Sequence, residues 1–409
     1  MHSESELKKQ FKLRAQKNPE KYYPVEILKS EGFFRKKCSV CGNFFWTALE
    51  RDVCGEPKCS GGYTFIGNSP ARERMDFIKV WQRFSSIFES QGYTPISRYP
   101  VVARWRDDTD FVQASIYDFQ PHCVSGEVDP PANPLVVPQF CLRFNDTDNV
   151  GVTGRHYTGF VMIGQHAFES PKNYRPNDYL SHIYTWLVKG MKIQKEDIQF
   201  HEDAWAGGGN MGPSMEFFSG GLEIGNQVYM QYDIKSGAPK ELEIKVLDMG
   251  MGQERPAWFT CGTNTSYEAV FPTVVKYLLK QTGVKQDSGI INKFLPYSSI
   301  LNVEEAGNID GAWEKIAEKI GEDVEVLRNQ VSLLAGVYSI GDHSRSLLMA
   351  LSDGALPSNA GGGYNLRVLV RRALDIISRH EWEISLPQVC EVHAKYLKPQ
   401  YPEVLENLG

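Results

Sequence analysis

Four cysteines near the N-terminus are spaced like metal ligands. They form the pattern Cys38-x2-Cys41-x12-Cys54-x4-Cys59, two close pairs with a ribbon-sized separation. Thiolates at this spacing can close a tetrahedral site around Zn²⁺, and four protein ligands leave no open position for a catalytic water. The pattern therefore predicts a structural zinc site. The alternative is that the pairs are incidental in a reducing compartment.

An arginine lies on the outward face of a predicted strand. Apolar residues alternate between Gln139 and Asn145, which places Arg143 on the face that points away from the core. A polar loop with Arg155 and His156 follows, and residues 159–163 are expected to form the returning strand. A guanidinium fork matches phosphate oxygens and stays charged at any working pH, so the pattern suits a nucleoside triphosphate. The alternative is a hairpin with a surface salt bridge.

A second predicted strand, residues 242–247, runs into a glycine-rich segment. That segment reads Asp248-Met-Gly-Met-Gly-Gln-Glu-Arg255, and we expect a turn and a helix start there. It lacks the Gly-Lys-Ser/Thr of a Walker loop and is not a dinucleotide fingerprint. The sequence is compatible with a phosphate site built from arginines on an antiparallel sheet.

The texture of the chain changes along its length, which predicts three parts: a leader and cysteine element at 1–66, a mixed strand and helix domain at 67–265, and a helical domain at 266–409. The first clear helix is expected after Asn68-Ser69-Pro70 and ends near Gly92. In the last third, Asp342 is expected to cap a helix. Helices are predicted there at about 312–320, 322–337, 343–353 and 363–380.

Composition limits the class of protein. The chain has 409 residues, 42% hydrophobic and 23% charged, with no apolar run of membrane-spanning length. Its start lacks the apolar stretch of a secretion signal, and the other four cysteines are scattered, so a cytosolic location is expected. A net charge of −6 argues against a protein that coats nucleic acid, so RNA contact would need a local basic face.

Three stretches, in order, resemble the hallmark motifs of the alanyl-tRNA synthetase family. Asp148 to Thr158, continuing to Phe168, is similar to the family's second motif, and Leu247 to Arg255 is similar to its third. Asp342-His-Ser-Arg345, Ser352 to Asn359 and Gly363 to Ala373 are similar to the helical domain that reads the tRNA acceptor stem. Arg98 to Arg106, with the N-terminal cysteines, points to the archaeal branch. The resemblance covers about residue 30 to the C-terminus.

The resemblance implies a class II α+β fold, an antiparallel sheet flanked by helices, with the zinc-ribbon-like element before it and the helical domain after it. By the family's pattern, Arg143 binds the α-phosphate of ATP and the substrate carboxylate. Arg255 lies over the adenine and meets the γ-phosphate, and Asp248 holds the α-amino group of alanine. Glu216 resembles an acid associated with Mg²⁺. The other positions that the resemblance places at the substrate are Met162, Trp205, Asn226, Val228, Gly250 and Gly252.

The same resemblance implies contacts with tRNA(Ala). Asn359 matches a residue that helps recognise the G·U pair of the acceptor stem, and Arg371 and Arg372 are expected at phosphates, unless that helix face is only solvated. His156 is a candidate base for transfer to tRNA, although a loop histidine is more often a hydrogen-bond partner.

The chain departs from the family pattern in two ways. Val161 stands where a glutamate usually precedes the second-motif methionine, and none of the nine histidines has the His-x3-His spacing of the editing domain. We expect a truncated, monomeric synthetase without editing. The alternatives are an aminoacyl ligase that loads a carrier other than tRNA, and a non-catalytic zinc and RNA-binding derivative.

Overall fold

A single mixed sheet organises the protein. The computed structural model describes residues 3–286, 289–301 and 307–408. Within them, the nine strands lie in the order β1 (Phe34–Lys37), β2 (Phe44–Thr47), β6 (Ile198–Gly207), β7 (Asn210–Ser219), β8 (Leu222–Asp233), β9 (Lys240–Gly252), β5 (Gly159–Glu169), β4 (Leu135–Leu142), β3 (Thr94–Pro95). Neighbouring strands pair antiparallel except β3 and β4, which are parallel. The expected class II arrangement is therefore present.

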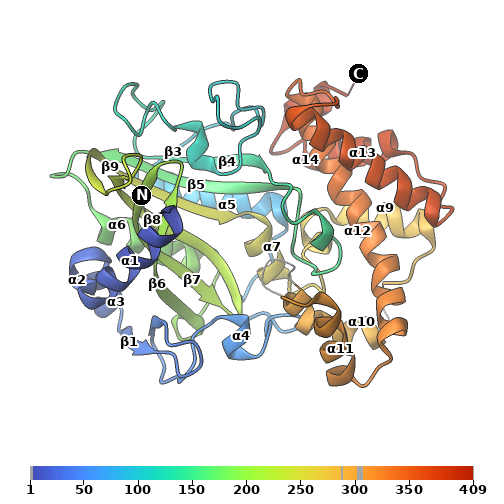
Figure 1. The fold of residues 1–409 in the computed structure, drawn as a ribbon, viewed down its shortest axis with the longest axis horizontal. Coiled ribbons are helices and arrows are strands. Elements are labelled where there is room, and N and C mark those ends of the chain that lie inside the picture. The colour runs from blue at the N-terminus through green and yellow to red at the C-terminus, as the bar shows by residue number, and fades with distance from the viewer. Residues whose placement is uncertain (1–2, 287–288, 302–306, 409) are drawn as a thin grey trace.

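Helices surround the sheet in two groups (Figure 1). The first group lies along the sheet: α1 (Glu4–Lys17), α2 (Pro19–Tyr22), α3 (Val25–Ser30), α4 (Pro57–Ser60), α5 (Phe77–Ser90), α6 (Pro176–Thr185) and α7 (Glu254–Cys261). The second gathers to one side: α8 (Tyr267–Val270), α9 (Pro272–Thr282), α10 (Gly289–Phe294), α11 (Ile309–Ile320), α12 (Val324–Ser352), α13 (Gly361–Arg379), α14 (Leu386–Leu397) and α15 (Pro402–Glu406). The predicted helical character of the last third is confirmed for its described residues.

One face of the sheet forms the main core. Leu247, Met249 and Met251 alternate along β9 and are fully buried in the same cluster as Phe77 and Phe84 of α5. Because strand side chains alternate, Asp248, Gly250 and Gly252 lie on the opposite face. That opposite face carries the candidate site.

The predicted break between two helices at Asp342 is wrong. Residues 324–352 form one continuous helix, α12, and Asp342 lies in its middle with no exposed surface. Its carboxylate accepts hydrogen bonds from the backbone N–H and the hydroxyl of Thr158, across the junction with the sheet. Aspartate is favoured at helix caps, but here a partner distant in sequence satisfies it instead.

Two other predicted boundaries are displaced. The helix expected after Asn68-Ser69-Pro70 is α5, which begins after Asp76; the Asp76 carboxylate accepts from the Lys79 N–H at 2.8 Å, whereas Ser69 forms a local turn with Ala71. Helix α5 is preceded by a helix of equal length, α1, in the leader. Strand β9 continues through Gly252 instead of turning at Asp248, because β5 and β8 pair with it on both sides along that stretch. In β9, pairing with both neighbouring strands outweighs the local preference of the glycines for a turn.

Candidate functional site

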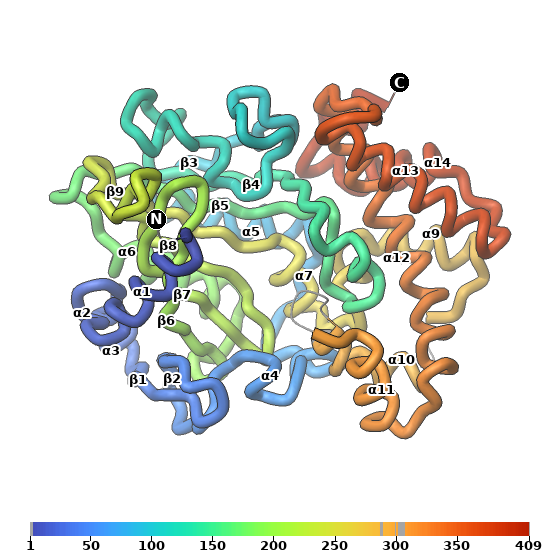
Figure 2. The backbone as a smooth tube through the Cα atoms, viewed as in Figure 1, coloured from blue at the N-terminus to red at the C-terminus, as the bar shows by residue number. Residues whose placement is uncertain are grey.

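The centre of the site is the face of β9 that carries Asp248, Gly250 and Gly252. In the sheet register His166 of β5 and Val228 of β8 stand opposite Asp248 on its two sides. The next pairs along the strand place Asn226 beside Gly250 and Met162 beside Gly252. Figure 2 shows these strands running side by side through the middle of the molecule.

The same face continues across two more strands. Glu216 of β7 pairs with Asn226, and Trp205 of β6 lies one strand further and packs in the same apolar cluster as Val228. Six of the residues that the sequence placed at the substrate therefore share one side of the sheet with Asp248: Met162, Trp205, Glu216, Asn226, Val228 and Gly250.

Glycine is required at 250 for a packing reason. A Cβ at Gly250 would lie 2.9 Å from the sulfur of Met162, so the thioether side chain covers the strand backbone at this point. A side chain there would have to displace Met162. The pair Met162 and Gly250 thus sets how close a substrate can approach the sheet.

Asp248 is a buried carboxylate without a fixed cation. Its side chain is 10% exposed, and no lysine or arginine pairs with it among the described residues. Burial raises the pKa of Asp248 to about 7. Beside it, the Oδ1 atom of Asn226 is buried and has no hydrogen-bond partner in the described structure. Two buried acceptors on the same face, without a cation between them, suit a ligand that brings its own positive charge.

The two arginines stand where the central strands end. Arg143 follows β4, is exposed, donates from Nε to the Gln113 carbonyl at 2.9 Å and lies 4.9 Å from the centre of the Phe160 ring. Arg255 lies in the first turn of α7 and donates to the carbonyl oxygen of Glu223 at 3.0 Å and pairs with its carboxylate at 3.0 Å. Both guanidinium groups are therefore available to solvent and to an anion.

A pocket of about 220 Å³ contains Arg255 but not Arg143 or Asp248. It is lined by Arg155, His156, Tyr157, Leu222, Glu223, Glu254, Arg255, Trp258 and Ser266. Glu223 was missed by the sequence reasoning, which named Arg155 only as part of the polar loop after Arg143. The signal for Glu223 was an acidic residue between two buried apolar positions, Leu222 and Ile224, close before Asn226.

His156 has a defined hydrogen-bond role in this pocket. Its Nδ1 lies 2.5 Å from the Thr153 hydroxyl, and its Nε2 lies 4.0 Å from Asp146. Burial, with the nearby charge of Arg155, lowers the pKa of His156 to about 4. The imidazole is neutral at neutral pH and is held as a partner of Thr153.

Acidic side chains gather on the same face where it crosses β6 and β7. Glu216, Glu56 and His201 place ligand atoms within 4.8 Å of one another. Burial, followed by the charges of Glu223, Asp203 and Glu56, raises the pKa of Glu216 well above its ordinary value. A divalent cation would relieve this crowding, because carboxylate oxygens are the ligands that Mg²⁺ prefers.

The four N-terminal cysteines come together as the spacing predicts. Their sulfur atoms lie within 4.8 Å of one another, and Cys41 and Cys54 are 3.7 Å apart. Tetrahedral zinc with Zn–S bonds of about 2.3 Å requires sulfur separations of roughly 3.8 Å. The cluster fits Zn²⁺. It lies at the edge of the catalytic sheet, since β2 pairs with β6.

The candidate RNA contacts lie around α13. Asn359 and Arg371 are exposed, and Asn359 accepts a hydrogen bond from Arg367. Arg372 instead turns toward the loop after β4, where its Nη1 lies 2.8 Å from Asp148. The structure therefore separates the two arginines, with Arg371 free of ion pairs among the described residues and Arg372 engaged.

The helical part is bonded directly to the catalytic sheet. Arg345 of α12 is 1% exposed and donates to the Gly159 carbonyl and to Glu254. Glu254 also accepts the N–H of Val161 at 3.0 Å, while the Val161 side chain is buried in the main core. Val161 departs from the family pattern, and Glu254 accepts the hydrogen bond from its backbone N–H.

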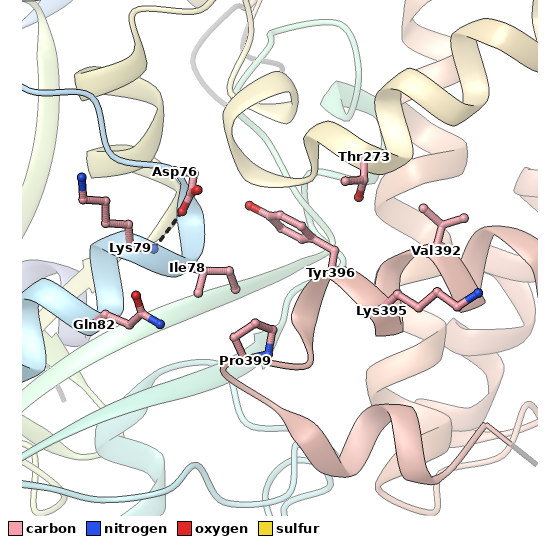
Figure 3. Close-up of a pocket in the computed structure, with 9 residues that line it drawn as sticks. All are labelled: Asp76, Ile78, Lys79, Gln82, Thr273, Val392, Lys395, Tyr396 and Pro399. Atoms are coloured by element: carbon pink, nitrogen blue, oxygen red, sulfur yellow. Dashed lines mark hydrogen bonds between the residues drawn. The ribbon is translucent and has the colours of Figure 1, made fainter.

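A separate pocket of about 780 Å³ lies between α5 and α14 (Figure 3). Ile78, Tyr396 and Pro399 line it with aliphatic and aromatic surface, and Lys79 and Lys395 stand at its sides. It contains none of the residues that the sequence placed at a site. The pocket of about 780 Å³ is therefore separate from the sheet face that carries Asp248.

Comparison with known proteins agrees with this arrangement. Residues 79–408 match the family described as tRNA synthetases class II (A). The chain is 48% identical over 404 residues to an alanine–tRNA ligase of Methanocella arvoryzae, covering 98% of this chain and 46% of that protein. It is 41% identical over 393 residues to that of Nitrosopumilus maritimus, covering 95% and 44%. It is 38% identical over 402 residues to that of Thermococcus kodakarensis, covering 93% and 44%. The chain spans about half the length of the curated relatives it matches.

Proposed function

Because the chain belongs to the family of class II tRNA synthetases (A), we propose that it activates L-alanine with ATP and transfers the alanyl group to tRNA(Ala). The relatives at 38% to 48% identity are named alanine–tRNA ligases, which supports this choice of substrate. The observation that carries the proposal is the shared sheet face, where a buried, cation-free Asp248 stands among apolar side chains.

Asp248 and Asn226 bind the ammonium group of alanine in this proposal. The ammonium supplies the positive charge that Asp248 lacks and hydrogens for the unpartnered Oδ1 of Asn226. Val228, Met162 and Trp205 surround the methyl group, and the covered backbone at Gly250 limits the space for larger side chains.

Arg143 and Arg255 bind the triphosphate. The carboxylate of alanine is already ionised at neutral pH and attacks the α-phosphorus, so catalysis is mainly positioning and charge neutralisation. Arg143 meets the α-phosphate and the amino-acid carboxylate, while Arg255 lies against the adenine and the γ-phosphate. Both guanidinium groups have solvent-exposed surface, and in this proposal they exchange their present partners, Gln113 and Glu223, for phosphate oxygens.

Two metals belong to the proposal. Glu216 would hold Mg²⁺ with the bound ATP, and Glu223 joins it because its charge already acts on Glu216. Bound Mg²⁺ neutralises part of the triphosphate charge. Zn²⁺ at the four cysteines would fix the edge strands β1 and β2 and takes no part in the chemistry.

Transfer to tRNA involves the exposed residues of α13. Asn359 and Arg371 are both exposed on the helical part, which supports contacts with the acceptor stem. Arg372 is proposed as a second phosphate contact once its pairing with Asp148 is exchanged.

No helix in the described part of the chain is long and apolar enough to cross a membrane. We place the activity in the cytoplasm and expect a monomer, which size-exclusion chromatography with light scattering would check.

ATP–pyrophosphate exchange tests the activation step. Alanine is expected to support exchange, with glycine and serine weaker and other amino acids inactive. Arg143→Ala and Arg255→Ala should each abolish it, whereas Arg371→Ala should leave exchange intact and weaken aminoacylation of tRNA. Charging of a carrier protein but not of tRNA would favour the rival ligase, and absence of exchange would favour a non-catalytic derivative.

A further inference from the structure

A fully buried histidine faces the carboxylate that is proposed to bind the amino acid. His166 lies directly opposite Asp248 in the register of β5 and β9, and its Nδ1 is 3.6 Å from Asp248 Oδ1. The imidazole has no exposed surface, and its Nδ1 has no hydrogen-bond partner in the described structure. At this distance the pair is about half an ångström beyond hydrogen-bond length.

The other end of the ring is held in place. Nε2 lies 3.1 Å from the hydroxyl of Ser115, which belongs to the short 3-10 turn Ser115–Asp118. The edge of the Phe119 ring packs against the imidazole with centroids 5.1 Å apart. The ring can therefore neither flip freely nor withdraw from Asp248.

Gly164 leaves room for this arrangement. A Cβ at position 164 would lie 2.3 Å from His166 Nε2 and 2.6 Å from the Ser115 hydroxyl. The strand thus carries a glycine where the histidine and serine meet, one position before Gln165. Three residues, Ser115, Gly164 and His166, fit together around a single ring orientation.

We propose that His166 is a positioning residue for Asp248: Ser115 donates to Nε2, and Nδ1–H points at the Asp248 carboxylate and fixes it for the ammonium group of the substrate. This inference rests on the proposed function for the identity of the substrate. A neutral donor can orient a carboxylate without neutralising it, which leaves its charge for the ligand. Burial lowers the pKa of His166 to about 3, so the imidazole stays neutral.

A purely structural role would make a different set of predictions. A core histidine that only fills space can be replaced by phenylalanine with a loss of stability and no selective effect on one substrate. A positioning residue changes the KM for alanine and leaves the KM for ATP unchanged, because Arg143 and Arg255 do not contact it.

Three substitutions of His166 separate these roles. His166→Asn places an amide N–H close to the position of Nδ1, whereas His166→Gln places it near Nε2, toward Ser115. His166→Phe removes both the Nδ1–H donor and the Nε2 acceptor. His393→Phe is the matched control, since His393 is also fully buried and packs edge-on against a phenylalanine, Phe271, at 5.3 Å.

Alanine-dependent pyrophosphate exchange is the activity readout. The KM for alanine is expected to rise about tenfold to a hundredfold in His166→Phe and His166→Gln, and to stay within about threefold of wild type in His166→Asn and His393→Phe. The KM for ATP should stay unchanged in all four. Equal effects of the Asn, Gln and Phe substitutions, or an unchanged KM for alanine in His166→Phe, would overturn the proposal.

The tautomer of His166 gives a second test that needs no activity. Nitrogen chemical shifts of the ¹⁵N-labelled wild-type protein, assigned by the signal lost in His166→Asn, should show Nδ1 protonated and Nε2 unprotonated. The Nε2–H tautomer would overturn the inference. If wild type showed no alanine-dependent exchange, the proposed function would fail, and the tautomer would still decide the orientation of His166.

Discussion

Arg345 of helix α12 donates a hydrogen bond from Nη2 to Oε1 of Glu254 at 3.1 Å, one residue before Arg255. Both side chains are almost fully buried, and the same guanidinium also donates to the Gly159 carbonyl. The rings of Phe77, Phe140, Tyr157 and Phe271 surround it. The Arg345 guanidinium therefore joins the helical part to the sheet at two places, Gly159 and Glu254.

Replacing Arg345 should destabilise the whole protein. Arg345→Ala leaves Glu254 buried without its cation, which costs about 3–5 kcal/mol of unfolding free energy. Denaturant unfolding measures the loss, and Arg371→Ala, an exposed arginine of α13, is the control, with a change of about 0.5 kcal/mol or less. The double variant Arg345→Met with Glu254→Gln should recover part of the loss. A loss below about 1 kcal/mol in Arg345→Ala would contradict this account.

Asp248→Asn should bind alanine poorly and yet fold more stably. An amide cannot pair with an ammonium ion, so the KM for alanine should rise roughly 100-fold with the KM for ATP unchanged. Because the pKa of Asp248 is raised from 3.8 to about 7 in the folded state, ionisation opposes folding above pH 4. The variant should gain on the order of 2–4 kcal/mol over wild type at pH 8 and little at pH 4. Equal stability at both pH values would argue against a desolvated carboxylate.

The affinity for alanine should fall in acid. Asp248 must be ionised to bind ammonium, so the KM for alanine is expected to rise about tenfold per pH unit below about pH 7 and to level off above it. The titratable groups near it keep one charge state over this range: His166 has a pKa of about 3, and burial raises the pKa of Tyr174 well above 10. Exchange assays from pH 5.5 to 8.5 measure the profile. A flat profile would exclude Asp248 as the ammonium ligand.

Zinc removal should loosen one edge of the sheet and spare the chemistry. Elemental analysis is expected to give one zinc per chain, lost in Cys54→Ser. Gly55, next to Cys54, packs closely on the sheet, since a Cβ there would lie 2.6 Å from Gln199 and 2.9 Å from Phe218. Loss of zinc from Cys54 should therefore disturb this contact and lower the melting temperature by several degrees. Cys390→Ser, outside the cluster, is the control. Complete loss of exchange in a still folded Cys54→Ser protein would contradict a structural role.

Much of the fold could be predicted from local pattern, and two of the failures, at Asp342 and along β9, share one physical cause. The cysteine cluster and helix α13 follow from ligand spacing and helical periodicity. The alternation between Gln139 and Asn145 predicted Arg143 on a strand, whereas β4 ends at Leu142 and Arg143 follows it. Asp342 was read as a cap because its partner, Thr158, is distant in sequence. Tertiary pairing also extended β9 beyond its glycines.

The candidate site was predictable by motif but not by geometry. Asp248, Asn226 and Met162 were named from the resemblance, and the register then places them on one face. His166 was visible in the sequence only as part of a motif, and Glu223 was not singled out. Their roles depend on the register between neighbouring strands. The residue pattern of one strand does not reveal that register.

Alternation along β9 has a consequence for how the protein could vary. A slip of β9 by one residue against its neighbours would bury Asp248 among aromatic rings and expose Met249 in its place. An inserted or deleted residue in this strand would therefore destroy the amino-acid site and the core in the same event. Substitution on a neighbouring strand, at a position such as Val228, is the route to a new substrate preference that leaves β9 intact.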